Sequence, residues 1–245
     1  MQSVKNAVRH ILEKGLNLIS PCSCFLCGMN ACRDEIPVCG DCIGTFYRML
    51  NTPCPSCGRA ISGCDCSGET LAFLFWYSPG EAHRIIGAVK NDADRRMIRF
   101  FAELLALRIK QLHKKPFEAV TYIPRRKKGI RAAGYDQAKL LAEETAKALR
   151  VPCVAMLRRH GSEEQKLLSA SERRKTMKNR YSVIRDNVVS ESGEPYARVL
   201  LIDDVCTTGA TLDACSALLR QEGIKQVISA VIAKTPKKEG WMTLG

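Results

Sequence analysis

Short apolar runs alternate with stretches of helical spacing over most of the chain beyond residue 70. Compact runs of β-branched and aromatic residues between glycine, proline or charged residues predict strands, and apolar residues that recur every three or four positions predict helices. We therefore expect strands at 71–77, 117–123, 151–157, 181–184, 199–202 and 226–233, and helices at 81–90, 93–112, 138–149 and 212–219. Strands that alternate with helices indicate an α/β fold, a parallel sheet flanked by helices.

The strand predicted at Val199–Ile202 leads directly into polar residues. Four apolar residues in succession are typical of a strand buried on both faces of a parallel sheet. Two carboxylates, Asp203 and Asp204, follow where the strand should leave the sheet. The turn into the next helix then reads Thr207, Thr208, Gly209, Ala210 and Thr211.

That turn has the properties of an anion site. Unpaired N–H groups at a helix N-terminus attract a phosphate, glycine allows close approach of the backbone, and threonine hydroxyls add donors. The acids would repel a phosphate but accept hydrogen bonds from neutral hydroxyls beside it. A phosphate next to a diol describes a ribose 5-phosphate, so we expect Asp203 and Asp204 to hold the ribose and residues 207–211 its phosphate.

Residues 199–211 resemble the 5-phosphoribosyl-1-pyrophosphate (PRPP) signature of type I phosphoribosyltransferases. Two alternatives are an ordinary dinucleotide-binding βα turn with one ribose-binding acid, and the Mg²⁺-binding acid pair of a phosphotransfer receiver. Neither alternative needs the Thr-Thr-Gly-Ala-Thr run directly behind the acids. The resemblance implies PRPP as ligand, with Mg²⁺ on its pyrophosphate oxygens.

Cysteines are concentrated at the other end of the chain. Ten of the thirteen lie between Cys22 and Cys66. They include four closely spaced pairs, the pattern of knuckles that present two thiolates to one metal ion. We expect two structural Zn²⁺ ions, bound by Cys24, Cys27, Cys39 and Cys42, and by Cys54, Cys57, Cys64 and Cys66.

This sequential sharing closes short loops and is favoured by entropy, although a cross-braced arrangement remains open. Cys22 and Cys32 are surplus to the pairs, and their roles are not assigned. The cysteine distribution predicts two domains: residues 1–68, with an N-terminal helix at 3–19 and a double zinc ribbon, and residues 69–245, with the phosphoribosyltransferase-like sheet.

Positive charge is concentrated beside the predicted phosphate site. The formal net charge is +13, and residues 123–180 hold sixteen Lys and Arg against six Asp and Glu. Within this region a basic loop leaves the carboxyl end of the strand at 117–123, where ligands bind in open α/β sheets. We expect Arg125, Arg126 and Arg131 to stabilise departing pyrophosphate, and the polar segment at 158–180 to close over the site. Lys90, at the end of a predicted helix, is expected to serve the helix dipole rather than a ligand.

The apolar runs are too short to cross a bilayer, and charged residues within the first nineteen positions do not suit a signal peptide. The expected location is the cytoplasm.

The four cysteine pairs, the segment Gly134-Tyr135-Asp136-Gln137-Ala138 and the terminal signature together resemble the ComF/GntX family. Its members pair a double zinc ribbon with a phosphoribosyltransferase-like domain, and the resemblance implies a role in DNA uptake during natural transformation. The chain departs from the family pattern at Ala133, where an arginine is frequent, and at Lys175-Thr176, where an asparagine is usual.

Three functions remain open from the sequence. The first is a phosphoribosyltransferase, although no residue can be named as the base that activates an acceptor. The second is a non-catalytic protein that senses PRPP or a nucleotide and binds single-stranded DNA through its basic face. The third is a scaffold that docks a DNA-translocation helicase. The chain has no GxxxxGK[ST] motif, so it is not itself a P-loop motor.

Overall fold

The computed structural model describes residues 23–29, 36–54, 56–64, 66, 70–91, 95–126, 129–131, 134–160 and 180–236. The helix predicted at 3–19, the segment at 161–179, and Cys22 and Cys32 lie outside these residues.

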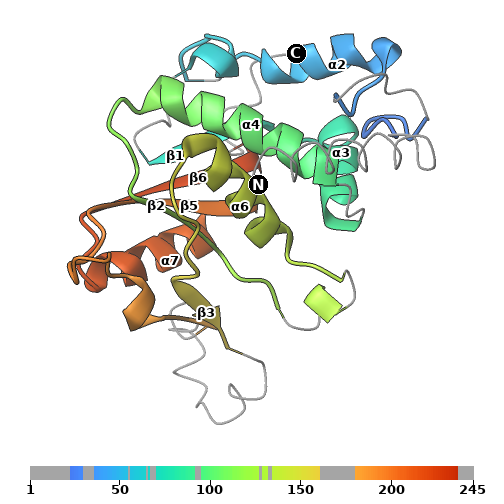
Figure 1. The fold of residues 1–245 in the computed structure, drawn as a ribbon. Helices are drawn as coiled ribbons and strands as arrows, with labels where there is room; N and C mark the ends of the chain where they lie inside the picture. The colour runs from blue at the N-terminus through green and yellow to red at the C-terminus, as the bar shows by residue number, and fades with distance from the viewer. Residues whose placement is uncertain are drawn as a thin grey trace, which may run out of the picture.

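A four-stranded parallel sheet forms the centre of the molecule, with strand order β1-β6-β5-β2 (Figure 1). The strands are β1 (Leu71–Trp76), β2 (Ala119–Tyr122), β5 (Arg198–Cys206) and β6 (Gln226–Lys234). Each lies where the hydrophobic pattern predicts a strand. The central strands β5 and β6 have near-continuous buried runs, as expected when both faces of a parallel sheet are covered.

Helices cover both faces of this sheet (Figure 1). On one face pack α3 (Glu81–Asn91), α4 (Arg95–Leu112) and α6 (Gln137–Leu149), whose apolar residues share a core with Leu200 and Ile202 of β5. On the other face, α7 (Ala210–Gln221) shares a second core with Val199 and Leu201. Alternate residues of β5 thus serve opposite cores, the period expected of a strand.

The strand predicted at 151–157 forms only in part. Cys153 makes an isolated parallel bridge to Val120, at the edge of the sheet next to β2. Pro152 has no N–H group to donate, which limits pairing at such an edge. The chain then turns away, and β3 (Leu157–Arg159) pairs antiparallel with β4 (Tyr181–Val183) in a separate hairpin. A 3-10 turn, η3 (Arg185–Asn187), follows.

The cysteine-rich region packs against β1, at the opposite edge of the described sheet. It contains α2 (Gly40–Leu50) and the 3-10 turn η1 (Ile61–Gly63), and both contact β1. The rings of Phe25 and Phe46 lie 5.3 and 6.2 Å from that of Phe101 in α4, measured between centroids. An uncovered edge strand offers unpaired backbone groups to other chains, and this packing shields β1.

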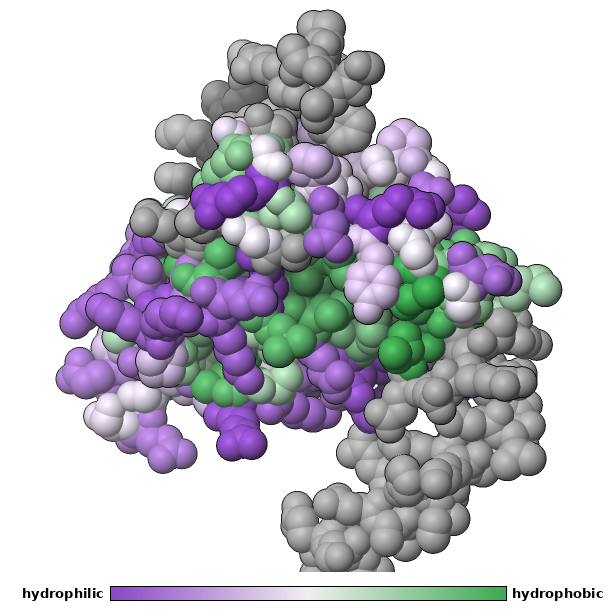
Figure 2. All heavy atoms as spheres, turned by 90° about the horizontal axis from the view of Figure 1, so that it is seen from above, coloured by the Kyte–Doolittle hydropathy of each residue, from purple (hydrophilic) through white to green (hydrophobic). Residues whose placement is uncertain are grey.

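The side of the molecule that carries α2 has a mixed surface. Hydrophobic residues are visible at the centre of this face among hydrophilic ones (Figure 2). No helix in the described ranges is both long enough and apolar enough to span a membrane.

Candidate functional site

The carboxyl end of β5 carries the two predicted acids. β5 is longer than the sequence indicates and runs through Asp203 and Asp204 to Cys206, so both acids belong to the strand rather than to the turn. Side chains alternate along a strand. Asp204 accordingly meets α3 on one side, through Lys90, while Asp203 alternates with it on the face of Val199 and Leu201, which share a core with α7.

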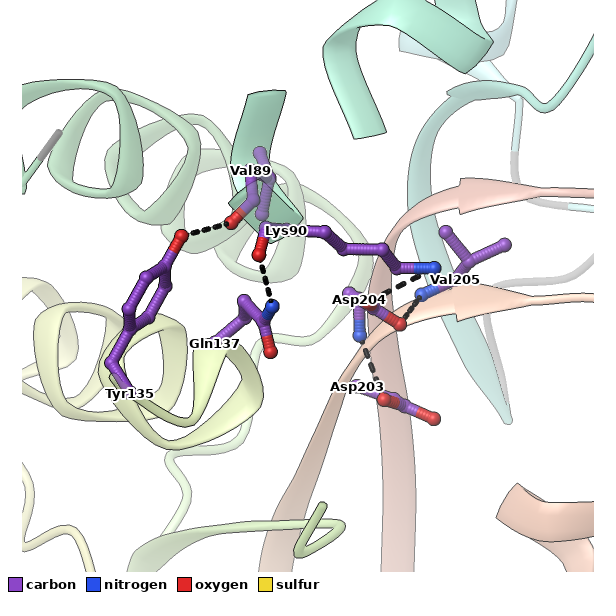
Figure 3. A network of polar contacts seen from close by, with 7 residues as sticks. All are labelled: Val89, Lys90, Tyr135, Gln137, Asp203, Asp204 and Val205. Carbon is purple, nitrogen blue, oxygen red and sulfur yellow. Dashed lines mark hydrogen bonds and ion pairs between the residues drawn. The ribbon is translucent and has the colours of Figure 1, made fainter. Parts of the chain in front are cut away.

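Backbone amides hold both carboxylates. The N–H of Asp204 donates to Asp203 Oδ1 at 2.9 Å, and the N–H of Val205 donates to Asp204 Oδ1 at 2.8 Å (Figure 3). Burial raises the pKa of Asp203 well above its usual range, and the neighbouring charge of Asp204 raises it further. The acid pair is therefore ordered, and one member sits in an environment that disfavours its charge.

The turn behind the acids is open. Thr207, Thr208 and Ala210 are exposed, and Gly209 and Thr211 are partly exposed. Gly209 precedes the first residue of α7 and has no side chain to cap it, while the Thr208 hydroxyl accepts a hydrogen bond from the N–H of Ala210 at 3.4 Å. Its φ of +82° lies in the left-handed region that glycine adopts without strain. The predicted phosphate-binding residues thus surround a helix N-terminus that faces solvent and whose first N–H is bonded to the Thr208 hydroxyl.

The basic loop leaves the sheet beside the acid pair. The N–H of Ile123 donates to the carbonyl of Ile202 at 3.0 Å, which places the start of the loop level with the end of β5. Arg126 and Arg131 are exposed, while Arg125 is partly buried and its Nη1 has no hydrogen-bond partner in the described part of the chain. The loop therefore lies at the sheet edge where the sequence places it.

Lys90 is the cation that the structure brings to the acids. Its Nζ lies 3.4 Å from Asp204 Oδ2 (Figure 3). From the sequence alone this lysine is expected to serve the helix dipole, because nothing in the local pattern of α3 relates it to residues at the end of β5. The contact depends on the way α3 packs over the sheet, which periodicity does not reveal.

Two residues of the Gly-Tyr-Asp-Gln segment support Lys90. The Tyr135 hydroxyl donates to the carbonyl of Val89 at 3.1 Å, and Gln137 Nε2 donates to the carbonyl of Lys90 at 2.7 Å (Figure 3). The last carbonyls of a helix have no partner within it, so these side chains satisfy the end of α3. Sequence reasoning used this segment as a mark of the family and missed its structural role.

Eight cysteines form two clusters. Cys24, Cys27, Cys39 and Cys42 gather in one, and Cys54, Cys57, Cys64 and Cys66 in the other, with the sulfur atoms of each set within 4.8 Å of one another. The grouping is sequential, as predicted, rather than cross-braced.

The geometry of the clusters fits zinc. Four Zn–S bonds of about 2.3 Å in a tetrahedron place the sulfurs about 3.8 Å apart. Cys27 and Cys39 are 3.8 Å apart, and Cys57 and Cys64 are 3.5 Å apart. A hydrogen bond from the backbone of Arg59, and a second bond from Cys66, lower the pKa of Cys57 to about 6, whereas burial raises the pKa of Cys64 to about 12. Both clusters could hold structural zinc.

Comparison with known proteins locates the family signal in the same part of the chain. Residues 137–241 match the phosphoribosyl transferase domain model. This range contains α6, β5, α7 and β6, and so includes the acid pair and the threonine turn. Together with the parallel sheet and the cysteine clusters, the match confirms the predicted fold class.

Two relatives have names that refer to competence. Competence protein F of Haemophilus influenzae is 40% identical over 96 residues, which make up 38% of this chain and 40% of that protein. Competence protein ComFC of Streptococcus pneumoniae is 27% identical over 212 residues, covering 80% of this chain and 86% of that protein. Among solved structures, the glutamine PRPP amidotransferase of B. subtilis matches with 20% identity and a TM-score of 0.39, over 63% of this chain and 28% of that one.

Proposed function

Because this chain belongs to the ComF/GntX family and carries a phosphoribosyl transferase domain, we propose that it binds PRPP, or another phosphorylated ribose, at the end of β5. The observation that carries the proposal is the geometry of residues 203–211. Two ordered carboxylates stand at the carboxyl end of a central strand, and an open helix N-terminus follows them.

Each part of this arrangement has a chemical role. The amides and hydroxyls of Thr207–Thr211 bind the 5-phosphate, because a helix N-terminus and hydroxyl donors both favour an anion. Asp203 and Asp204 accept hydrogen bonds from the ribose hydroxyls. Arg125, Arg126 and Arg131 lie on the loop beside them and neutralise the pyrophosphate. Bound Mg²⁺ supplies charge neutralisation on pyrophosphate oxygens, and the anionic ligand itself offers the oxygen donors that this ion prefers.

Transfer of the ribose to an acceptor is the reaction that this site would support. A nucleophile attacks C1 of the ribose, the bond from C1 to the pyrophosphate oxygen breaks, and the electron pair leaves with pyrophosphate. Positive charge develops on the ring in this process, and the nearby carboxylates stabilise it. The acceptor is not identified by any side chain of the site.

The names of two relatives support a biological setting in competence. We propose that the protein acts in DNA uptake during natural transformation, within the cytoplasm. The net charge of +13 and the exposed Arg126 and Arg131 suit contact with single-stranded DNA. A DNA-translocation helicase is a further proposed partner. Residues 1–68 would supply two structural Zn²⁺ sites and residues 69–245 the ligand site.

Calorimetric titration with PRPP and Mg²⁺ tests the proposal. The wild-type chain should bind, and Asp203→Asn/Asp204→Asn should lose most of the affinity because amides accept hydrogen bonds from hydroxyls more weakly than carboxylates do. Asp186→Asn, an exposed acid on η3, is the matched control and should bind like wild type. Equal affinity in all three proteins, or no binding to the wild type, would contradict the proposal.

A parallel assay separates binding from turnover. Pyrophosphate release from PRPP in the presence of nucleobases or amines would establish the transferase, and binding without release would establish a sensor.

A further inference from the structure

The ion pair between Lys90 and Asp204 joins two segments that lie far apart in the sequence. Lys90 is in the last turn of α3, and Asp204 is near the end of β5. The Lys90 side chain is 38% exposed and that of Asp204 is 19% exposed, so the ion pair is partly accessible to solvent. A pair in this position contributes more to the orientation of the carboxylate than to global stability.

The acid pair needs a cation if it is to accept an anionic ligand. Two adjacent carboxylates repel each other and also repel a phosphorylated sugar. The ammonium of Lys90 offsets part of this charge, and its field opposes the rise in the pKa of Asp203. In the described part of the chain, the contact at 3.4 Å provides this neutralisation directly at the carboxylate.

The position of Lys90 is fixed from the other side of the helix end. Tyr135 and Gln137 bind the carbonyls of Val89 and Lys90, and so hold the final turn of α3. Asp136, between them, accepts a hydrogen bond from the N–H of Arg125 at 3.0 Å. The tripeptide 135–137, which we call the brace, thus ties the helix end to the basic loop.

We propose that Lys90 is a positioning residue of the phosphoribosyl site, which orients Asp204 toward the ribose hydroxyls, and that Tyr135 and Gln137 act through Lys90. The inference rests on the proposed function. The ammonium of Lys90 lies beside Oδ2 of Asp204, and the N–H of Val205 donates to Oδ1. Both oxygens of the carboxylate therefore have a partner before the ligand binds. Pre-ordering of this kind removes an entropic cost from binding.

A double-mutant cycle tests this role by calorimetric titration with PRPP and Mg²⁺. Lys90→Met should weaken binding about ten- to a hundredfold, the range of a charge-assisted hydrogen bond. In an Asp204→Asn background the same change should have little further effect, because the group that Lys90 orients is altered. Lys139→Met removes an exposed charge from α6 in the same way and should leave the affinity unchanged.

Substitutions in the brace provide a second part of the experiment. Tyr135→Phe and Gln137→Leu each remove one hydrogen bond to the helix end. Each should weaken PRPP binding several-fold in the wild-type background and have little effect in the Lys90→Met background. Melting temperatures, measured in parallel, show whether a variant is folded.

Two results would overturn the inference. One is unchanged affinity in folded Lys90→Met. The other is a full additional loss when Lys90→Met is combined with Asp204→Asn, because Lys90 would then act by general charge rather than through Asp204. If the wild type binds PRPP and Asp204→Asn binds it more weakly, the proposed function stands in either case. Absence of PRPP binding to the wild type would contradict the proposed function itself.

Discussion

Gly209 determines the shape of the turn that leads into α7. Its φ of +82° is unfavourable for a residue with a side chain, whereas an added Cβ would meet only ordinary contacts, Asp213 Oδ2 and Cys206 Sγ at 3.7 Å. The cost of a substitution is therefore conformational rather than steric. We predict that Gly209→Ala destabilises the protein by about 1–2 kcal/mol and weakens phosphate binding, since the alanine shifts the turn.

Thermal unfolding and ribose 5-phosphate titration check this prediction. Gly87→Ala in α3 is the control, because nothing lies within 4 Å of the added Cβ and the backbone is helical. That variant should gain about 0.5–1 kcal/mol. A Gly209→Ala protein as stable as wild type would show that the turn tolerates a side chain.

Asp203 illustrates a conflict between stability and binding. The pKa of Asp203 is raised in the folded state, so the folded state binds the proton more tightly than the unfolded state does. The free energy of unfolding therefore falls as the pH rises from the unfolded-state pKa to the folded-state pKa. Above the unfolded-state pKa, the environment of Asp203 therefore lowers the free energy of unfolding. We predict that Asp203→Asn is more stable than wild type at pH 7, even though it binds PRPP more weakly.

Denaturant unfolding from pH 3 to pH 8 measures the effect. The stability gain of Asp203→Asn should shrink as the pH falls through the normal pKa of aspartate, about 3.9, because below it the carboxyl is protonated in both the folded and the unfolded state. A gain that is constant with pH would mean that the carboxylate charge is not its cause.

At the scale of elements, α6 follows an N-cap residue that accepts two hydrogen bonds. Asp136 accepts from the N–H of Lys139 at 3.3 Å, as an N-cap does, and from the N–H of Arg125 at 3.0 Å. We predict that Asp136→Ala costs about 1 kcal/mol or more, because a cap alone contributes that amount. Asp136→Asn keeps an oxygen acceptor and should retain most of the stability, as measured by denaturant unfolding; equal losses would exclude the capping role.

The two cysteine clusters give a prediction that concerns metal content. Wild-type protein should contain two zinc ions per chain, one for each cluster. Cys39→Ser and Cys64→Ser should each lose one ion, while Cys153→Ser, outside both clusters, should keep two. Elemental analysis of the purified proteins measures the zinc content. Two zinc ions per chain in Cys39→Ser or in Cys64→Ser would contradict the assignment.

For the whole molecule, the cysteine-rich region and the sheet share one core. Phe25 and Phe46 pack on α4, and Arg108 of α4 donates to the carbonyl of Cys64. We predict that chelation of zinc lowers the melting temperature of the entire chain in a single transition rather than unfolding the N-terminal region alone. Calorimetry with and without chelator checks this, and an unchanged transition of the sheet would contradict it.

Local patterns predicted much of the architecture. The apolar run Val199–Ile202 located the central strand and Gly209 located the turn, although the strand extends through the two acids to Cys206. Residue spacing also grouped the cysteines correctly. The structure of residues 151–157 was harder to predict. Their apolar content predicts a buried strand, but Pro152 limits hydrogen-bond pairing at the edge of the sheet.

Contacts between distant elements were beyond the sequence. A lysine such as Lys90 is common at the end of a helix, so its residue type gives no signal. Its ion pair with Asp204 depends on the packing of α3 over β5. The same holds for Tyr135 and Gln137, because their hydrogen-bond partners are backbone carbonyls of another helix. Every residue has such a carbonyl, so the sequence does not indicate which one is bound.

A crystal structure of the wild-type chain with PRPP and Mg²⁺ tests the central claim most directly. The 5-phosphate should lie within hydrogen-bond distance of the amides of residues 207–211, with the ribose hydroxyls donating to Asp203 and Asp204. A phosphate bound elsewhere, with the threonine turn empty and the ribose away from the two acids, would contradict the account.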